Sequence, residues 1–199
     1  MNLNNSVALI TGGSAGIGRA IAKTLADSGA HVAITGRDKK RLDDAAQALG
    51  VFPIQADVSK EADVLRTYRE LLKPVHKRAI EWAHARGVKA HLHSCGDVNP
   101  FVPELIEIGL DALNPLEVKA GMDPIALKKK FGDKLVFHGG INAVLWDKPD
   151  QIEAEMRRVV PAVARNGGYI FSSDHSVPST VSLEAFRRII NLAKTLGAY

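Results

Sequence analysis

Seven short apolar segments alternate with helical patterns along almost the whole chain, and this alternation constrains the fold more than any other feature. Because parallel neighbours must be joined by a crossover, strands that alternate with helices predict a parallel α/β sheet. A chain of 199 residues that is 46% hydrophobic can bury one such core. We therefore expect one α/β domain over residues 1–199, with a mostly parallel seven-stranded sheet and helices on both faces. The predicted strands span residues 7–11, 31–35, 51–56, 88–93, 110–113, 134–138 and 168–172.

The connection between the third and fourth strands decides the strand order. It is the longest helical pattern, from about Lys60 to Arg86, and it contains Pro74. Proline in a helix interior removes a hydrogen bond, so the pattern predicts two helices or one kinked helix. If this connection returns strand four to strand one, the order is 3-2-1-4-5-6-7, as in an open Rossmann-like sheet, and this is the order we expect. The alternative, in which strand four follows strand three, is a closed or partly closed βα barrel.

The charge and the cysteine content exclude several classes of protein. The net charge is +4, and the only tight basic run is Lys128-Lys129-Lys130. A basic run at the end of a predicted helix complements the helix dipole, so we expect no nucleic-acid partner. The single Cys95 cannot form an internal disulfide, and no long uncharged apolar run or signal-like N-terminus is present. These features predict a cytoplasmic protein without a membrane partner.

Residues 11–18 form a glycine-rich turn, Thr-Gly-Gly-Ser-Ala-Gly-Ile-Gly, between the first strand and a helical pattern. In such a turn the glycines allow a tight bend and let a pyrophosphate approach backbone amides at a helix N-terminus. The second strand ends in Thr35-Gly36-Arg37, and the third ends in Ala56-Asp57-Val58-Ser59. Three elements at separate places in the chain therefore favour a dinucleotide ligand.

On these three elements, residues 3–66 resemble the nucleotide-binding half of the short-chain dehydrogenase/reductase family. The resemblance implies that residues of the turn surround the pyrophosphate and ribose, and that residues after the third strand meet the adenine. Arg37 stands where an acidic residue would otherwise hold the ribose hydroxyls. A guanidinium can pair with a 2′-phosphate, so the predicted cofactor is weakly bound NADP. The predicted contacts are Gly12, Ser14, Gly16, Ile17, Gly18, Arg37, Asp57 and Val58.

The catalytic pair of that family is absent from this sequence. The family uses a Tyr-x-x-x-Lys pair, in which the lysine lowers the tyrosine pKa so that a proton can be exchanged during hydride transfer. The chain has three tyrosines, Tyr68, Tyr169 and Tyr199, and none of them is followed by lysine four residues later. The resemblance therefore implies nucleotide binding without a recognisable proton donor.

Polar residues follow the last four predicted strands. The motifs are His91-Leu92-His93-Ser94-Cys95-Gly96-Asp97, Leu113-Asn114-Pro115-Leu116-Glu117, His138-Gly139-Gly140-Ile141-Asn142 and Gly167-Gly168-Tyr169-Ile170. On these motifs, residues 68–196 resemble the last four βα units of the uroporphyrinogen decarboxylase family, which folds as a (βα)8 TIM barrel. Alternation along a strand places His91, His93 and Cys95 on one side. Because the strands of such a barrel end at one face, we expect one polar mouth formed by His93, Cys95, Glu117, His138, Asn142, Asp174 and His175.

Neither resemblance brings a complete catalytic set. His93 and Cys95 supply two of the three protein ligands that zinc usually takes, so no metal is expected. The first hypothesis is therefore an engineered or recombined chimeric scaffold without catalysis, with a half Rossmann fragment (1–66) joined to a half-barrel (67–199). The alternatives are an NADP-dependent oxidoreductase of the short-chain dehydrogenase type and a metal-assisted lyase or methyltransferase. An uncovered half-barrel face would also favour a homo-oligomer.

Overall fold

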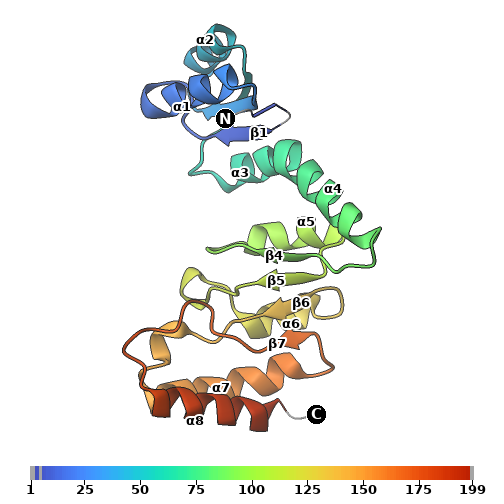
Figure 1. Cartoon of the computed structure of the whole chain (residues 1–199), viewed down its shortest axis with the longest axis vertical. Helices are drawn as coiled ribbons and strands as arrows, with labels where there is room; N and C mark the ends of the chain where they lie inside the picture. The colour runs from blue at the N-terminus through green and yellow to red at the C-terminus, as the bar shows by residue number, and fades with distance from the viewer. Residues whose placement is uncertain (1–2, 5, 198–199) are drawn as a thin grey trace. The chain divides into compact units, whose positions relative to one another are not determined.

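The computed structural model describes residues 3–4 and 6–197 (Figure 1). Contacts between its residues divide it into two compact units, Met1–Pro74 and Val75–Tyr199. The first unit holds a three-stranded parallel sheet in the order β1-β2-β3, and the second holds a four-stranded parallel sheet in the order β4-β5-β6-β7. Each unit therefore has a sheet of its own.

In the first unit the central strand β2 is buried along almost its whole length. Helices α1 and α2 lie together on one side of the sheet, and α3 lies on the other (Figure 1). The core under α1 and α2 is built from small and branched side chains, Ala22, Val32, Ile34, Leu42, Ala45 and Ala46. The elements are β1 (Val7–Ile10), α1 (Gly16–Asp27), β2 (His31–Gly36), α2 (Lys39–Leu49), β3 (Phe52–Gln55) and α3 (Glu61–Thr67).

A continuous helical run joins the two units. Helix α3 is followed without a gap by a π-helical stretch, η1 (Tyr68–Leu72), and then by α4 (Lys73–His84). Pro74 is the second residue of α4. Proline has no N–H to donate, and its ring crowds the carbonyl four residues earlier, so a wider turn directly before it relieves both problems. The sequence predicted two helices or one kinked helix, and the structure shows one continuous helical run with an irregular stretch before Pro74.

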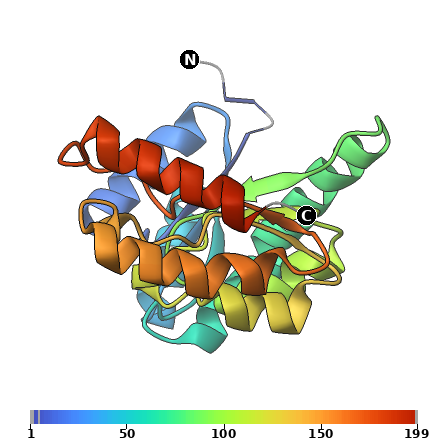
Figure 2. The ribbon, with the colours of Figure 1, turned by 90° about the horizontal axis from the view of Figure 1, so that it is seen from below.

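In the second unit the longest helices, α7 and α8, lie side by side (Figure 2). They enclose a core of large residues, among them Trp146, Ile152, Met156 and Ile189. The strands are β4 (His91–His93), β5 (Ala112–Asn114), β6 (Val136–His138) and β7 (Tyr169–Ile170). The helices are η2 (Asn99–Phe101), α5 (Val102–Glu107), η3 (Val118–Ala120), α6 (Pro124–Phe131), η4 (Ala143–Leu145), α7 (Pro149–Ala164) and α8 (Leu183–Leu196).

The register of the second sheet separates its two faces. Leu92 is aligned with Leu113, and Leu113 with Phe137; the last two are fully buried. Because side chains alternate along a strand, the neighbours of these residues point to the opposite face. His93 is aligned with Asn114 on that face, and the rings of His91 and His138 lie 5.2 Å apart. One face is therefore apolar, and the other carries histidines.

The predicted fold class is confirmed, and one pairing within it is wrong. The strands are parallel, helices cover both faces of the first sheet, and the orders 3-2-1 and 4-5-6-7 occur as predicted. However, β1 does not pair with β4 among the described residues, so there are two sheets instead of one, and no barrel closes there. β1 belongs to the first compact unit and β4 to the second, and the strands of each unit pair within that unit. That residues 1–199 unfold as one domain stays a prediction.

Candidate functional site

The glycine turn of the first unit leaves its backbone open at two positions. Gly12 and Gly16 adopt φ angles of 70° and 54°, and a Cβ added at either residue would meet nothing within 4 Å. Helix α1 begins at Gly16, and its N-cap residue, Ala15, offers no side chain to accept from the first amides. No acidic residue stands in the first turn of α1 either. An open helix N-terminus of this kind, with its positive dipole end, suits a phosphate.

Two other glycines and Gly36 are needed for close packing of the turn. A Cβ at Gly18 would lie 2.6 Å from the carbonyl oxygen of Gly12, and a Cβ at Gly13 would lie 2.5 Å from Cγ2 of Ile34. A Cβ at Gly36 would lie 3.0 Å from Oγ of the buried Ser14. The turn is therefore pressed against the carboxyl end of β2. This contact brings the residue after Gly36, the predicted phosphate reader Arg37, next to the turn.

A polar cavity of about 300 Å³ lies at the carboxyl ends of β2 and β3. Two predicted site residues, Arg37 and Asp57, line it together. The Nε2 amide of Gln55 donates to the carbonyl oxygen of Arg37 at 3.1 Å, and Nη2 of Arg66 donates to the carbonyl oxygen of Gln55 at 2.6 Å. The sequence did not single out five further lining residues, Gln55, Ala56, Lys60, Asp63 and Arg66. Their place at the end of the third strand and in the segment and helix that follow it was the available signal.

The acidic groups of this cavity are held by their own hydrogen bonds. Asp57 accepts from the hydroxyl and the amide of Ser59 at 2.8 and 3.0 Å, and these bonds lower the pKa of Asp57, with a further contribution from the charges of Arg37 and Lys60. Asp63 accepts from the amide of Asp57 and pairs with Arg66, which lowers the pKa of Asp63. Among the residues that the structure describes, Arg37 and Lys60 have no ion-pair partner. The cavity therefore offers two cations to a ligand.

Two further predicted contacts lie at the surface of the first unit. Ile17 and Val58 are apolar but 82% and 65% exposed, as expected of side chains that a ligand would cover. Asp38, the acidic neighbour of Arg37, accepts from the amide of Arg41 at 2.9 Å and caps α2. Its carboxylate is therefore engaged with the helix.

A second polar cavity, of about 370 Å³, lies at the carboxyl ends of the strands of the second unit. Five of the seven residues predicted to form one mouth line it, namely His93, Cys95, His138, Asp174 and His175. Glu117 and Asn142 do not line it: Glu117 accepts from the amide of Gly96 at 2.6 Å, and Asn142 accepts from the amide of Val144 at 3.0 Å. The sequence assigned no role to the other lining residues, Asn114, Pro115, Ser172, Ser173 and Ser176.

The carboxylates around this cavity hold its rim together. Asp174 is only 2% exposed and accepts from the amides of Val118 and Ala143 at 2.9 and 2.7 Å. It thereby joins the loops that follow β5, β6 and β7, while Glu117 joins the loops after β4 and β5 through Gly96. Backbone N–H groups, not another side chain, balance the buried charge of Asp174 in these contacts. Asp174 therefore acts as a clamp of the rim.

Two polar atoms in this cavity are left without partners. Nδ1 of His138 and Oγ of Ser173 are buried and make no hydrogen bond. Burial lowers the pKa of His138, and the nearby His91 and His93 lower it further, so this imidazole is held neutral. Buried polar atoms are nearly always paired in native structures, so these two are exceptions in this unit.

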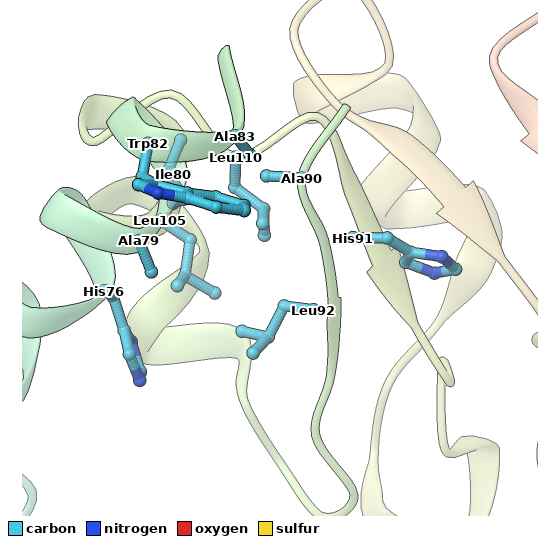
Figure 3. A pocket seen from close by; sticks show the side chains of 10 residues that line it. All are labelled: His76, Ala79, Ile80, Trp82, Ala83, Ala90, His91, Leu92, Leu105 and Leu110. Carbon is cyan, nitrogen blue, oxygen red and sulfur yellow. The ribbon is translucent and has the colours of Figure 1, made fainter. Parts of the chain in front are cut away.

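A third cavity, of about 360 Å³, is apolar and lies between α4, α5 and β4. Figure 3 shows Leu92 and Trp82 on the side of this cavity, while the ring of His91 points to the opposite face of the strand. Ile80 and Leu105 also belong to the apolar lining of this cavity. This cavity offers few polar groups for chemistry. Side chains alternate along β4, so Leu92 faces this cavity and His91 faces the other side of the strand.

The described part of the chain lacks two kinds of site. None of its helices is both long and apolar enough to cross a membrane. Among the same residues, no cluster of three or more His, Cys, Asp or Glu side chains could hold a metal ion.

Comparison with protein families and curated proteins reveals a mixed character. A family model described as uroporphyrinogen decarboxylase (URO-D) matches residues 39–196, well over half of the chain. Cis-2,3-dihydrobiphenyl-2,3-diol dehydrogenase of Pseudomonas sp. strain KKS102 is 43% identical over 72 residues, which are 35% of this chain and 26% of that protein. Peroxisomal 2,4-dienoyl-CoA reductase of Arabidopsis thaliana is 46% identical over 69 residues, or 32% of this chain and 23% of that protein. The chain spans about a quarter of the length of these relatives.

Solved structures give a weaker likeness. The 3-ketoacyl-(acyl-carrier-protein) reductase of Brucella melitensis, solved in complex with NADH, is 19% identical over 85% of this chain and 97% of that chain, with a TM-score of 0.37. An overlap this loose carries no argument about function. The two resemblances predicted from the sequence are nevertheless both confirmed, since one part of the chain matches short-chain dehydrogenases and a larger part matches the URO-D family.

The first function predicted from the sequence is wrong. A recombined scaffold without catalytic machinery is contradicted because the curated proteins that match the chain include a dehydrogenase and a reductase. The first alternative, an NADP-dependent oxidoreductase of the short-chain dehydrogenase type, fits these relatives better.

Proposed function

The chain belongs to the uroporphyrinogen decarboxylase family, and from the site in its other, reductase-like part we propose that it is an NADP-dependent oxidoreductase that binds NADP in the first unit. One observation carries the proposal. Ser14, in the turn before α1, packs on Gly36 at the end of β2, and the next residue, Arg37, lines the polar cavity. A phosphate site at the start of α1 and a cationic site at the end of β2 fit a dinucleotide with a 2′-phosphate.

The residues of the first unit have separate roles in this proposal. The amides at the start of α1 hold the pyrophosphate, and Gly12 and Gly16 leave room for it. Arg37 pairs with the 2′-phosphate, and Lys60 adds a second positive charge to the same cavity. Val58 covers the adenine, and Ile17 covers the part of the cofactor beyond the pyrophosphate. When bound, NADPH supplies the hydride that a reductase transfers.

The proposal assigns nucleotide binding, and no proton transfer, to the residues of the first unit. None of the three tyrosines belongs to a Tyr-x-x-x-Lys pair. The curated relatives match this chain over about a quarter of their own length. The first test of the proposal is therefore cofactor binding and its specificity.

Titration of the full chain with NADPH and NADH, followed by nucleotide fluorescence, tests this function. We expect NADPH to bind about tenfold more tightly, because a charge-assisted pair contributes roughly 1–2 kcal/mol. Arg37→Asp should remove or reverse the preference. Lys40→Asp makes the same change of charge on the exposed side of α2 and should leave the preference intact. No binding at millimolar nucleotide, or equal affinity for both nucleotides before and after the Arg37 change, would refute the proposal.

We also propose a cytoplasmic location and self-association, without nucleic-acid or membrane partners. Cys95 is exposed and unpaired, which is typical of a reducing compartment. Strands β4 and β7 form the two edges of the second sheet, and edge strands are common places for association. Light scattering at several protein concentrations would test the oligomer: a strictly monomeric mass would contradict it.

A further inference from the structure

A cysteine, a histidine and an asparagine form a chain of side-chain contacts at the polar cavity of the second unit. Sγ of Cys95 lies 3.5 Å from Nε2 of His93, and Nδ1 of His93 lies 2.7 Å from Oδ1 of Asn114. All three side chains line the cavity of about 370 Å³. We infer that Cys95 is a nucleophile for acyl transfer, with His93 as its general base and Asn114 as the residue that positions His93.

The hydrogen bonds of Asn114 determine where the protons lie. Its Nδ2 donates to the carbonyl oxygen of His138 at 3.2 Å, and a carbonyl can only accept. The amide is therefore oriented with Oδ1 toward His93, so Nδ1 of His93 must carry the proton of that bond. In a neutral imidazole the other nitrogen then has a free lone pair. Nε2 of His93 thus accepts from the thiol of Cys95, as a base requires.

The backbone holds the nucleophile on both sides. The amide of Ser94 donates to the carbonyl oxygen of Asn114 at 2.7 Å, and the amide of Gly96 donates to Oε2 of Glu117 at 2.6 Å. His93 and Asn114 are paired at the ends of β4 and β5. The three groups are therefore positioned by two adjacent strands and by the residues directly after them, which fixes the geometry better than a free loop would.

The lining of the cavity indicates the class of substrate. Cys95 is exposed, so a ligand can reach the sulfur. His175 lines the same cavity and is exposed, so its ring can bond the polar atoms of a ligand. Ser172 and Ser176 add two hydroxyls, and neither lysine nor arginine is among the described lining residues. A small, neutral carboxylic ester fits this lining better than an anionic substrate does.

Acylation of the cysteine and release of the acid consume only the ester and water. The thiol proton moves from Sγ of Cys95 to Nε2 of His93 while Sγ attacks the carbonyl carbon of the ester. A carbon–sulfur bond forms, the carbon–oxygen bond to the alcohol breaks, and the imidazolium returns its proton to the leaving oxygen. Water, deprotonated by the same Nε2, then hydrolyses the thioester and regenerates the thiol. No oxidant or further reactant is needed.

Other titratable groups face this cluster. His91 and His138 lie on the same face of the sheet, and Asp174 and His175 line the cavity. Glu117 is tied to Gly96 and to Lys119, 3.4 Å away. Because several groups titrate near the cysteine, a pH profile of the wild type alone would not identify the base. The test therefore depends on substitutions at a single pH.

Acylation of the full chain by p-nitrophenyl acetate, measured at pH 7 with EDTA present, tests the proposal. We expect a burst of one equivalent of p-nitrophenolate followed by slower turnover, both abolished in Cys95→Ala. His93→Gln should slow acylation by about 100-fold, a typical contribution of a general base. His31→Gln removes a histidine from an exposed site in the first unit and should leave the rate unchanged. An acylation rate in His93→Gln equal to that of the wild type would overturn the inference.

The role of Asn114 has its own readout. Asn114→Ala should slow acylation by about tenfold, whereas Asn114→Asp keeps an acceptor for Nδ1 of His93 and should restore most of the rate. A merely structural role would predict that both variants lose stability and rate together. Alkylation by iodoacetamide at pH 6.5 gives an independent measure of thiolate. Equal alkylation of wild type and His93→Gln would again contradict a base at His93.

Discussion

The candidate sites of the two units are built in opposite ways. We propose that the first unit forms its phosphate site from the backbone of one strand–turn–helix segment, where Gly12, Gly16 and Gly18 lie within seven residues. The second unit builds its cavity from residues that are far apart in the sequence, and its rim includes the bond between the amide of Val118 and Asp174 across 56 residues. A local site can keep its shape when the rest of a protein differs, whereas a distributed site depends on the whole sheet.

Core truncation is expected to have the largest effect. Phe137→Ala in the second unit should cost about 3–5 kcal/mol of unfolding free energy, and Leu42→Ala in the first about 2–5 kcal/mol. Both tryptophans, Trp82 and Trp146, lie in the second unit, so their fluorescence reports its unfolding alone. Because one helical run joins the units, we expect Leu42→Ala to lower the tryptophan transition as well. A tryptophan transition that ignores Leu42→Ala would show that the units are independent domains.

Removal of a backbone clamp should come next. Asp174→Ala leaves the amides of Val118 and Ala143 without their acceptor, which should cost about 3 kcal/mol because Asp174 is buried. Asp38→Ala in the first unit removes an exposed helix cap and should cost about 1 kcal/mol. Urea denaturation of both variants measures the difference. Equal losses would mean that burial does not distinguish the two carboxylates.

Two glycines of the turn should respond differently to the same methyl group. Gly18→Ala places Cβ against the backbone of Gly12 and should destabilise the chain by about 1–3 kcal/mol. Gly16→Ala meets no atom, but its positive φ should cost about 1–2 kcal/mol. Because the space beside Gly16 is where we propose the pyrophosphate, its variant should bind NADPH less tightly. Unchanged binding by a folded Gly16→Ala variant would move the phosphate elsewhere.

The smallest expected effect is a pH dependence. Partial burial raises the pKa of Asp111, but hydrogen bonds from the amide of Ala90 and from His84 and Lys89 outweigh it and bring the pKa to about 2. A carboxyl whose folded pKa lies below its unfolded value contributes stability above about pH 4, and this stability is lost as the pH falls toward 2. The unfolding free energy of Asp111→Asn should therefore fall less than that of the wild type as the pH is lowered from about 4 toward 2, which denaturation at several pH values measures. An identical pH dependence for the variant would exclude Asp111 as its source.

Short segments of the sequence were enough to predict the local parts of the molecule. Alternating apolar segments predicted parallel strands, and the glycine spacing predicted a turn whose φ angles and close contacts the structure shows. Arg37 and Asp57 were expected to share a site, and they line one cavity. These features depend on the period of a strand, the conformational freedom of glycine and the shared edge of neighbouring strands, all of which can be deduced from short segments.

Only the tertiary structure decided how distant residues are paired. The sequence predicted one sheet, whereas the described residues form two sheets, one in each unit. The sequence predicted that Asp174 lies at the polar mouth, but not that its carboxylate accepts from the amides of two other loops. The sequence also predicted no role for Asn114 beside His93. Hydrogen-bond partners separated by 21 to 56 residues depend on strand register and loop paths. Those are set by the packing of the whole core, which no local pattern records.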